Sequence, residues 1–343
     1  MIFFVLALVV ICLIGLRVRQ DTASTLNKSD TTIINGIFVA LIFLSHSTQY
    51  RAMSDSLIDV LYGKVQDAHN QWVVASFLAF SGFGVMRSLL AKGSAYLRRY
   101  PYNRLFKTLI NFDLAVLLYL LMNGVLGLSY DGLTVAGSFI GLTAVGNSNW
   151  YIFTILLMYL ATYVAARVFK EQQAAVALTV SVLCVLYVAI GHAVNLPARF
   201  YSTVCCYAAG LWLALYRDAL IRLLSTHKML SILVIAVPIV LTYRLRGNDY
   251  VMNVNSCFFV LAIVWFLTMF ELRSSILRFL GKHAFSIYIL QRLPMMALVR
   301  AFPTINRYVF TVASLGLTLL LAVAFDYFTA WFWKKIDTRR RAR

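Results

Sequence analysis

Charged residues are scarce in this chain, and no stretch between its apolar runs is long enough to fold alone. Only 13% of the 343 residues are charged, whereas 61% are hydrophobic and the mean hydropathy is +0.79. A soluble globular domain is about half apolar and about a quarter charged. The composition therefore excludes an ordinary soluble domain and predicts an all-α, polytopic transmembrane helical bundle.

Acidic residues are the rarest charged group: 13 Asp and Glu stand against 31 Lys and Arg, which gives a formal net charge of +18. A basic excess of this size is also found in nucleic-acid-binding proteins. Here, however, the basic residues gather at alternate ends of the apolar runs, as the positive-inside rule describes. We therefore expect a lipid bilayer as a partner and no nucleic acid.

The spacing of a metal site or of a disulfide framework is also lacking. The five cysteines form no Cys-x-x-Cys pair, and no histidine or cysteine pair has the spacing of zinc ligands. We expect no metal and no permanently bound cofactor.

Apolar runs near the 20-residue length of a membrane-spanning helix predict about eleven spans. They lie at about 1–17, 31–50, 71–90, 108–127, 150–168, 174–191, 200–216, 229–243, 252–270, 283–301 and 308–333. The glycine-rich stretch 128–148 is interpreted as a re-entrant or surface segment, because a span there would spoil the alternation of basic residues. Most basic residues then face one side, which predicts an outer N-terminus and a cytoplasmic C-terminus.

Three regions are expected along the chain. Residues 1–30 would form an N-terminal membrane anchor with a short cytoplasmic loop, 31–335 a membrane-embedded domain, and 336–343 a basic cytoplasmic tail. Arg17 and Arg19 follow the first apolar run, whereas a cleaved signal peptide carries its charges on the opposite flank. The first run is therefore expected to be an uncleaved anchor.

Two polar residues interrupt the apolar run 31–47. His46 follows Asn35 by eleven residues, so a helix would place both on one face, roughly 16 Å apart along its axis. A histidine in hydrocarbon costs free energy unless a partner or a water-filled cavity stabilises it. We therefore expect chemistry on this face. The structural alternative is a buried histidine bonded to a neighbouring helix.

Several segments, in this order, resemble the integral-membrane acyltransferase 3 family, the bacterial O-acyltransferases of surface carbohydrates. Residues 35–47 resemble its helix with a basic residue, a glycine and a later histidine, and 80–86 resemble its Ser-Gly-Phe/Tyr helix. Residues 96–107 are similar to its cytoplasmic Arg-x-x-Arg/Lys stretch. Residues 146–153 and 280–292 look like its Ser-x-Trp-Tyr/Phe and Leu-Gly-x-x-Ser-x-x-Ile-Tyr-Leu segments.

The resemblance covers about residues 30–335 and marks 31–335 as an acyltransferase domain. It implies transfer of an acyl group, with acetyl as the expected one, from acyl-CoA to a hydroxyl of a cell-surface or lipid-linked polysaccharide. It also implies the bacterial cytoplasmic membrane, a core of ten spans to which the anchor would add one, and polysaccharide-biosynthesis proteins as candidate partners. One departure is Asn35, where the family commonly has Arg or Lys.

The resemblance assigns roles to individual residues. His46 is the expected general base, because a neutral imidazole can take the proton of an attacking sugar hydroxyl. Apart from the resemblance, a polar side chain such as Tyr288 or Arg292, which are one helical turn apart, is expected to stabilise the oxyanion of the thioester. A basic cluster would hold the phosphates of acyl-CoA, or would serve only as a positive-inside anchor. Its members are Arg98, Arg99, Arg104 and Lys107.

Supporting roles are expected for further residues. Ser81 and the glycines after it, Gly82 and Gly84, would let helices approach closely. Asn149 and Trp150 open a span from the outer side and would contact the sugar acceptor, or this end of the span would serve only to anchor it at the membrane interface. 

Other titratable residues have structural interpretations. Asp113 would pair with Lys107. The remaining histidines are expected to be solvated, with outer loops for His69 and His192 and the cytoplasmic surface for His227 and His283.

Other functions stay open at this point. A transporter or flippase of a lipid-linked glycan is one, although secondary transporters often show duplicated halves and this chain has no internal repeat. A glycan polymerase usually carries a large outer loop, and the longest expected here is about 51–70. A non-catalytic member of the fold would be consistent with Asn35.

Overall fold

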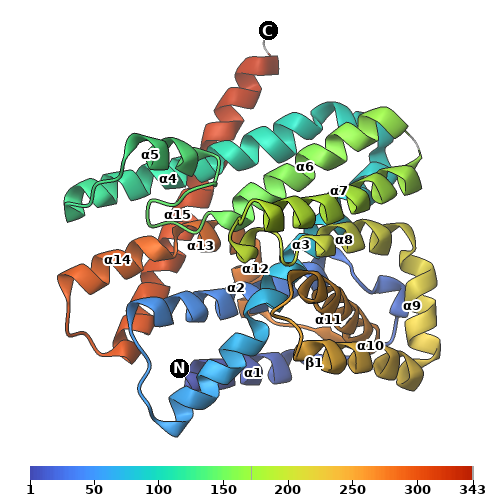
Figure 1. Ribbon diagram of the computed structural model, residues 1–343, viewed down its shortest axis with the longest axis horizontal. Coiled ribbons are helices and arrows are strands. Elements are labelled where there is room, and N and C mark those ends of the chain that lie inside the picture. Colours follow the sequence, from blue (N-terminus) through green and yellow to red (C-terminus); the bar gives the residue numbers. More distant parts are fainter. Residues whose placement is uncertain (171, 342–343) are drawn as a thin grey trace.

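The computed structural model describes residues 1–170 and 172–341, which form an all-α protein with one two-stranded ribbon (Figure 1). The first elements are α1 (Ile2–Gly15), β1 (Leu16–Val18), η1 (Thr22–Ser24), α2 (Lys28–Tyr50), α3 (Leu57–Tyr100), η2 (Pro101–Phe106), α4 (Lys107–Leu126), α5 (Gly132–Phe139), α6 (Trp150–Phe169) and α7 (Gln173–Ala193). They are followed by η3 (Ala198–Phe200), α8 (Cys205–Leu215), α9 (Arg217–Thr226), α10 (Lys228–Tyr243), α11 (Asp249–Met269), β2 (Phe270–Leu272), α12 (Ser275–Lys282), α13 (Ala284–Leu290), α14 (Arg292–Ala301) and α15 (Arg307–Arg341). The all-α prediction is confirmed. The last two residues of the tail expected at 336–343 lie outside the described residues.

Six helices in the described part of the chain are long and apolar enough to cross a membrane. They are Lys28–Tyr50, Leu57–Leu126, Trp150–Phe169, Gln173–Ala193, Asp249–Met269 and Arg307–Thr338. A bent pair, Ala198–Leu215 and Arg217–Thr226 with 87° between them, gives a seventh if it is counted as one span. The chain is thus built as an integral membrane protein, but its helix lengths do not reach the predicted count of eleven spans.

Part of the difference arises because two predicted spans are counted as one helix: the run Leu57–Leu126 contains both spans expected at 71–90 and 108–127. Other predicted spans are short: α1 has 14 residues, α10 has 16 and α8 has 11. The span expected at 283–301 is broken into α13 and α14. Pro294 explains this break, since it lacks an N–H and its ring crowds the carbonyl four residues earlier, at Leu290, where α13 ends.

A short antiparallel ribbon joins the end of α1 to the end of α11. Leu16 pairs with Leu272, and Val18 pairs with Phe270. The residue before the ribbon is Gly15, and a Cβ there would lie 2.8 Å from the backbone oxygen of Arg273. Only glycine lets the two chain segments approach this closely.

Two helix pairs cross with their backbones in contact, each at a pair of glycines. Where α2 crosses α12, a Cβ on Gly36 would lie 1.9 Å from a backbone oxygen of α12, and one on Gly281 would lie 1.7 Å from a backbone oxygen of α2. Where α3 crosses α8, the corresponding distances are 2.1 Å for Gly82 and 1.9 Å for Gly210. Small residues thus set the spacing of these helices, as is common in membranes.

Gly84 does not share this role, because a Cβ on it would meet nothing within 4 Å. The prediction of close packing is therefore supported at Gly82 and wrong at Gly84.

The segment 128–148 contains only the eight-residue helix α5 and connecting turns, which agrees with the expectation that it is not a span.

Candidate active site

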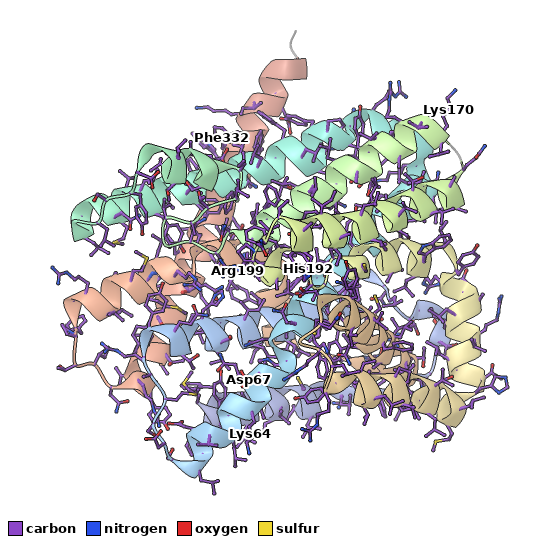
Figure 2. The ribbon with its side chains drawn as sticks, viewed as in Figure 1. Lys64, Asp67, Lys170, His192, Arg199 and Phe332 are labelled. Carbon is purple, nitrogen blue, oxygen red and sulfur yellow. The ribbon has the colours of Figure 1, made fainter. Side chains whose placement is uncertain are left out.

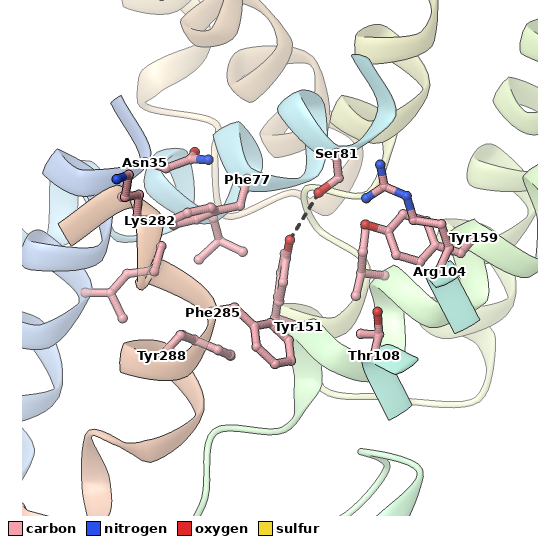
Figure 3. Close-up of a pocket in the computed structure, with 15 residues that line it drawn as sticks. Asn35, Phe77, Ser81, Arg104, Thr108, Tyr151, Tyr159, Lys282, Phe285 and Tyr288 are labelled. Atoms are coloured by element: carbon pink, nitrogen blue, oxygen red, sulfur yellow. Dashed lines mark hydrogen bonds between the residues drawn. The ribbon is translucent and has the colours of Figure 1, made fainter. Parts of the chain in front are cut away.

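A cavity of about 320 Å³ lies among α2, α3, η2, α4, α6, α12 and α13, and Figure 3 shows the side chains that line it. Four residues singled out from the sequence line it together: Asn35, Ser81, Arg104 and Tyr288. They come from four segments that lie far apart in the chain. The glycine crossings help to bring them together, since Asn35 precedes Gly36 and Ser81 precedes Gly82.

Two cations line the cavity and are placed on opposite sides of Tyr151 in Figure 3. Arg104 donates from Nε to the hydroxyl of Tyr96 at 2.9 Å, and its guanidinium lies 5.8 Å from the centre of the Tyr159 ring. Lys282 is the last residue of α12 and follows Gly281. No Asp or Glu occurs among the lining residues that the structure describes. The cavity therefore carries an excess of positive charge and suits an anionic group.

The four residues of the predicted basic cluster, at 98–107, lie in different surroundings in the structure. Arg98 and Arg99 are exposed on α3 and do not line the cavity. Lys107 forms a salt bridge with Asp337 of α15, with 3.0 Å between Nζ and the carboxylate. Of the four predicted residues, only Arg104 lines the cavity. Lys282 was not predicted, although it lies inside the Leu-Gly-x-x segment that resembles the family.

Aromatic rings form the centre of the cavity. The hydroxyls of Ser81 and Tyr151 are 3.5 Å apart, and the rings of Tyr151 and Tyr288 meet edge to face with centroids 5.6 Å apart. Phe77 packs against Tyr151 with centroids 6.2 Å apart. Ser81 thus faces the cavity and a tyrosine, so its side chain does more than allow close helix packing.

His46 lies behind Tyr288 and does not itself line the cavity. The two rings have their centroids 6.5 Å apart. The Nδ1 atom of His46 is buried and has no hydrogen-bond partner among the described residues. The alternative of a histidine satisfied at Nδ1 by a neighbouring helix therefore does not hold among the described residues.

Arg292 begins α14 just after the break in the helix. Its Nε donates to the hydroxyl of Ser148 at 3.2 Å, a second nitrogen donates to the side-chain oxygen of Gln49, and the guanidinium lies 5.9 Å from the Tyr50 ring. All of these partners are neutral. Because Gln49 is one helical turn from His46, Arg292 lies close to His46, and both residues are outside the lining of the cavity.

Asn149 and Trp150 are placed at the start of α6 but do not line the cavity. Asn149 donates to the backbone oxygen of Gly141 at 2.9 Å and is buried, so its side chain orders the preceding loop. The residue before Asn149, Ser148, accepts a hydrogen bond from Arg292 and so lies nearer to His46.

Two expectations for single residues are corrected. Asp113 does not pair with Lys107, which is bonded to Asp337, and its Oδ1 is buried without a partner among the described residues. His69 lies within α3, not in an outer loop, and both of its ring nitrogens are buried without partners in the described part of the chain.

His283 is also corrected: it is half-buried, and its Nδ1 contacts the carboxylate of Asp326 in α15. The same carboxylate accepts a hydrogen bond from Ser286. Since Lys282 and His283 are consecutive, this contact ties the end of α12, and with it one wall of the cavity, to α15.

Comparison with known protein families gives a match. A family described as an acyltransferase domain, of the acyltransferase 3 type, matches residues 32–327. No curated protein matches the chain. No solved structure matches it either. The matched region includes Asn35, His46, Arg104, Lys282 and Arg292, and it covers most of the chain. The chain therefore belongs to the acyltransferase 3 family of membrane acyltransferases.

Proposed function

We propose that this protein transfers an acyl group, acetyl in the first instance, from acyl-CoA to a hydroxyl of a cell-surface or lipid-linked glycan. The observation that carries the proposal is the positively charged cavity, lined by Arg104 and Lys282 with no acidic residue in its described lining. Membership in the family supports acyl transfer as the reaction.

The donor is an anion that suits this cavity. Acyl-CoA carries a pyrophosphate and a 3′-phosphate, which Arg binds through its planar fork and Lys through a compact charge. At about 320 Å³ the cavity is near the lower limit of the roughly 300–1,000 Å³ typical of small-molecule sites. It would therefore receive the acyl-pantetheine arm and the nearest phosphates, while the nucleotide stays at the surface near Arg98 and Arg99.

The acceptor would approach from the side of His46 and Arg292. His46 takes the proton of the acceptor hydroxyl, and the oxygen attacks the thioester carbonyl. The hydroxyl of Tyr288 stabilises the resulting oxyanion, because this ring lies between the donor cavity and the base. The carbon–sulfur bond then breaks, and the thiolate of CoA leaves with the proton that His46 returns, so that no net charge is left on the protein.

The orientation in the membrane belongs to the same proposal. The side with Arg98, Arg99 and the end of α15 would face the cytoplasm of a bacterial inner membrane, because this side carries most of the basic residues. The shorter and broken helices would complete an eleven-span bundle around the long ones. Polysaccharide-biosynthesis proteins would supply the glycan.

Transfer of label tests the function directly. Membranes that contain the wild-type protein are incubated with acetyl-CoA labelled in the acetyl group, and label on extracted glycan is measured. His46→Ala should abolish labelling at an unchanged protein level, whereas Lys64→Ala, an exposed residue of α3 away from the cavity, should not. Absence of label with the wild type would favour a flippase or a non-catalytic member. Normal labelling by His46→Ala would contradict the mechanism.

A further inference from the structure

A second pocket, of about 460 Å³, lies where α3, η3 and the start of α11 meet. It shares no lining residue with the candidate active-site cavity. Its polar lining consists of Asp67, Gln71, Ser202, Arg246 and Asp249. Figure 2 shows Asp67 on the part of α3 that also carries Lys64, with His192 and Arg199 nearer the centre of the view. The candidate active site makes no use of this pocket.

The side-chain oxygen of Gln71, in the wall of this pocket, lacks a hydrogen-bond donor among the described residues. Oε1 of Gln71 is buried and accepts no hydrogen bond from any described residue. Buried polar atoms in proteins are almost always hydrogen-bonded, so this oxygen calls for a donor from a ligand. Asp67 and Gln71 are one turn apart on α3 and so project to the same side. Both would accept hydrogen bonds from one bound molecule.

The charges of the pocket narrow the class of ligand. The lining holds two carboxylates, Asp67 and Asp249, and one guanidinium, Arg246. With His192, whose Nδ1 lies 3.9 Å from Asp249, counted as neutral, this gives a formal excess of one negative charge. This disfavours a phosphate or another anion. A metal ion is also disfavoured, because the described residues contain no group of three His, Cys, Asp or Glu that could hold one, and Arg246 would repel it.

What remains is a neutral molecule rich in hydroxyls. Hydroxyl groups donate to the carboxylates and to Gln71, and they accept from the Arg246 guanidinium and the Ser202 hydroxyl. Neighbouring hydroxyls of a sugar ring offer donors and acceptors side by side. We propose that this pocket binds a saccharide.

The same helix connects the pocket with His46. On the adjoining face of α3, Asn70 accepts from Ser45 at 2.8 Å, and Gln66 donates to Ser45 at 3.0 Å. Ser45 is the residue before His46 in α2. If the proposed function holds, and only then, the bound saccharide is a part of the glycan acceptor beyond the sugar that receives the acyl group.

Binding is measured on the full chain in lipid nanodiscs, without acyl-CoA, by saturation-transfer-difference NMR. The probes are maltotriose, mannotriose and chitotriose, each offered to the wild type and to variants. At least one should give a signal with the wild type, and Gln71→Leu and Asp249→Asn should weaken its binding by about tenfold. Asp67→Asn, at an exposed position where folding is not at risk, should act in the same direction. Lys64→Ala, outside the pocket, should bind like the wild type.

Two results of the sugar-binding measurement would overturn the proposal: no binding of any of the three probes at 20 mM, or equal binding by wild type and pocket variants. Calcium binding that is lost in Asp249→Asn, in place of sugar binding, would also overturn it. His46→Ala should still bind the probe. If the wild type transfers no label but binds a probe sugar, the acyl-transfer proposal fails and the saccharide proposal stands. If the wild type transfers label but binds no probe sugar, the saccharide proposal alone fails.

Discussion

The ring of Tyr288 lies 6.5 Å from the ring of His46, and the same tyrosine forms part of the wall of the charged cavity. In the proposed reaction, a thioester in the cavity would therefore contact Tyr288 before it reaches His46. The proposed place of the donor and the proposed base then lie on either side of one residue in the reaction path. Substitutions at the proposed catalytic residues should therefore change kcat, and substitutions in the cavity wall should change the KM for acetyl-CoA.

Tyr288→Phe should reduce kcat and leave the KM for acetyl-CoA nearly unchanged. The ring, and thus the packing against Tyr151, is kept, while the hydroxyl that stabilises the oxyanion is removed. Loss of one such donor typically costs about 10²–10³ in kcat. Tyr151→Phe is the matched control and should have a much smaller effect. Steady-state acetyl transfer by purified protein checks this, and equal losses in the two variants would contradict the assignment.

His46→Gln should lower acetyl transfer by about 100-fold or more, since general-base catalysis typically contributes about 10²–10⁴-fold. The KM for acetyl-CoA should change little, because His46 does not line the cavity. His69→Gln replaces another histidine with buried ring nitrogens, away from the site, and should keep full activity. Transfer by His46→Gln within twofold of the wild type would exclude this base.

Arg104→Gln and Lys282→Gln should each raise the KM for acetyl-CoA by about tenfold, since a hydrogen bond to a charged group contributes about 1.5–3 kcal/mol. Arg98→Gln should have a much weaker effect, because Arg98 is exposed outside the cavity. Initial rates over a range of acetyl-CoA concentrations check this. An equal rise for Arg98 and Arg104 would indicate that the donor binds at the surface only.

Gly36→Ala should destabilise the fold by about 1–3 kcal/mol, the usual cost of overpacking. The added Cβ would lie 1.9 Å from the backbone oxygen of Leu277, so α2 and α12 must separate. Gly84→Ala is the matched control on α3, with nothing within 4 Å of its Cβ, and should be neutral or slightly stabilising. Thermal unfolding in detergent, followed by size-exclusion chromatography, distinguishes them. Equal melting of the two variants would contradict the contact.

The sequence predicted the helical class and several members of the cavity. Asn35, Ser81, Arg104 and Tyr288 were chosen because their segments resemble those of one family, and the structure brings all four into one cavity. The hydrophobic pattern was sufficient for the long helices α2, α6, α7 and α11. It was insufficient for the span expected at 283–301, because an apolar average does not register the single missing N–H of Pro294.

Contacts between residues far apart in the chain could not be predicted from the sequence. Lys107 looked like part of a phosphate-binding cluster, but its partner Asp337 is 230 positions further along the chain. His283 looked solvated, but Asp326 from another helix contacts it. Lys282 had no local signal beyond its charge, and only the crossing of α12 over α2 brings it to the cavity.

The salt bridge between Lys107 and Asp337 has a practical consequence for anyone who purifies this protein. An affinity tag fused after residue 343 would follow Asp337, whose carboxylate holds Lys107, by only a few positions in sequence, and Lys107 is one turn from Arg104. Acidic epitope tags at this end would compete for the same lysine, close to a residue that lines the candidate cavity. Kinetic work is therefore better done with a tag that can be cleaved off.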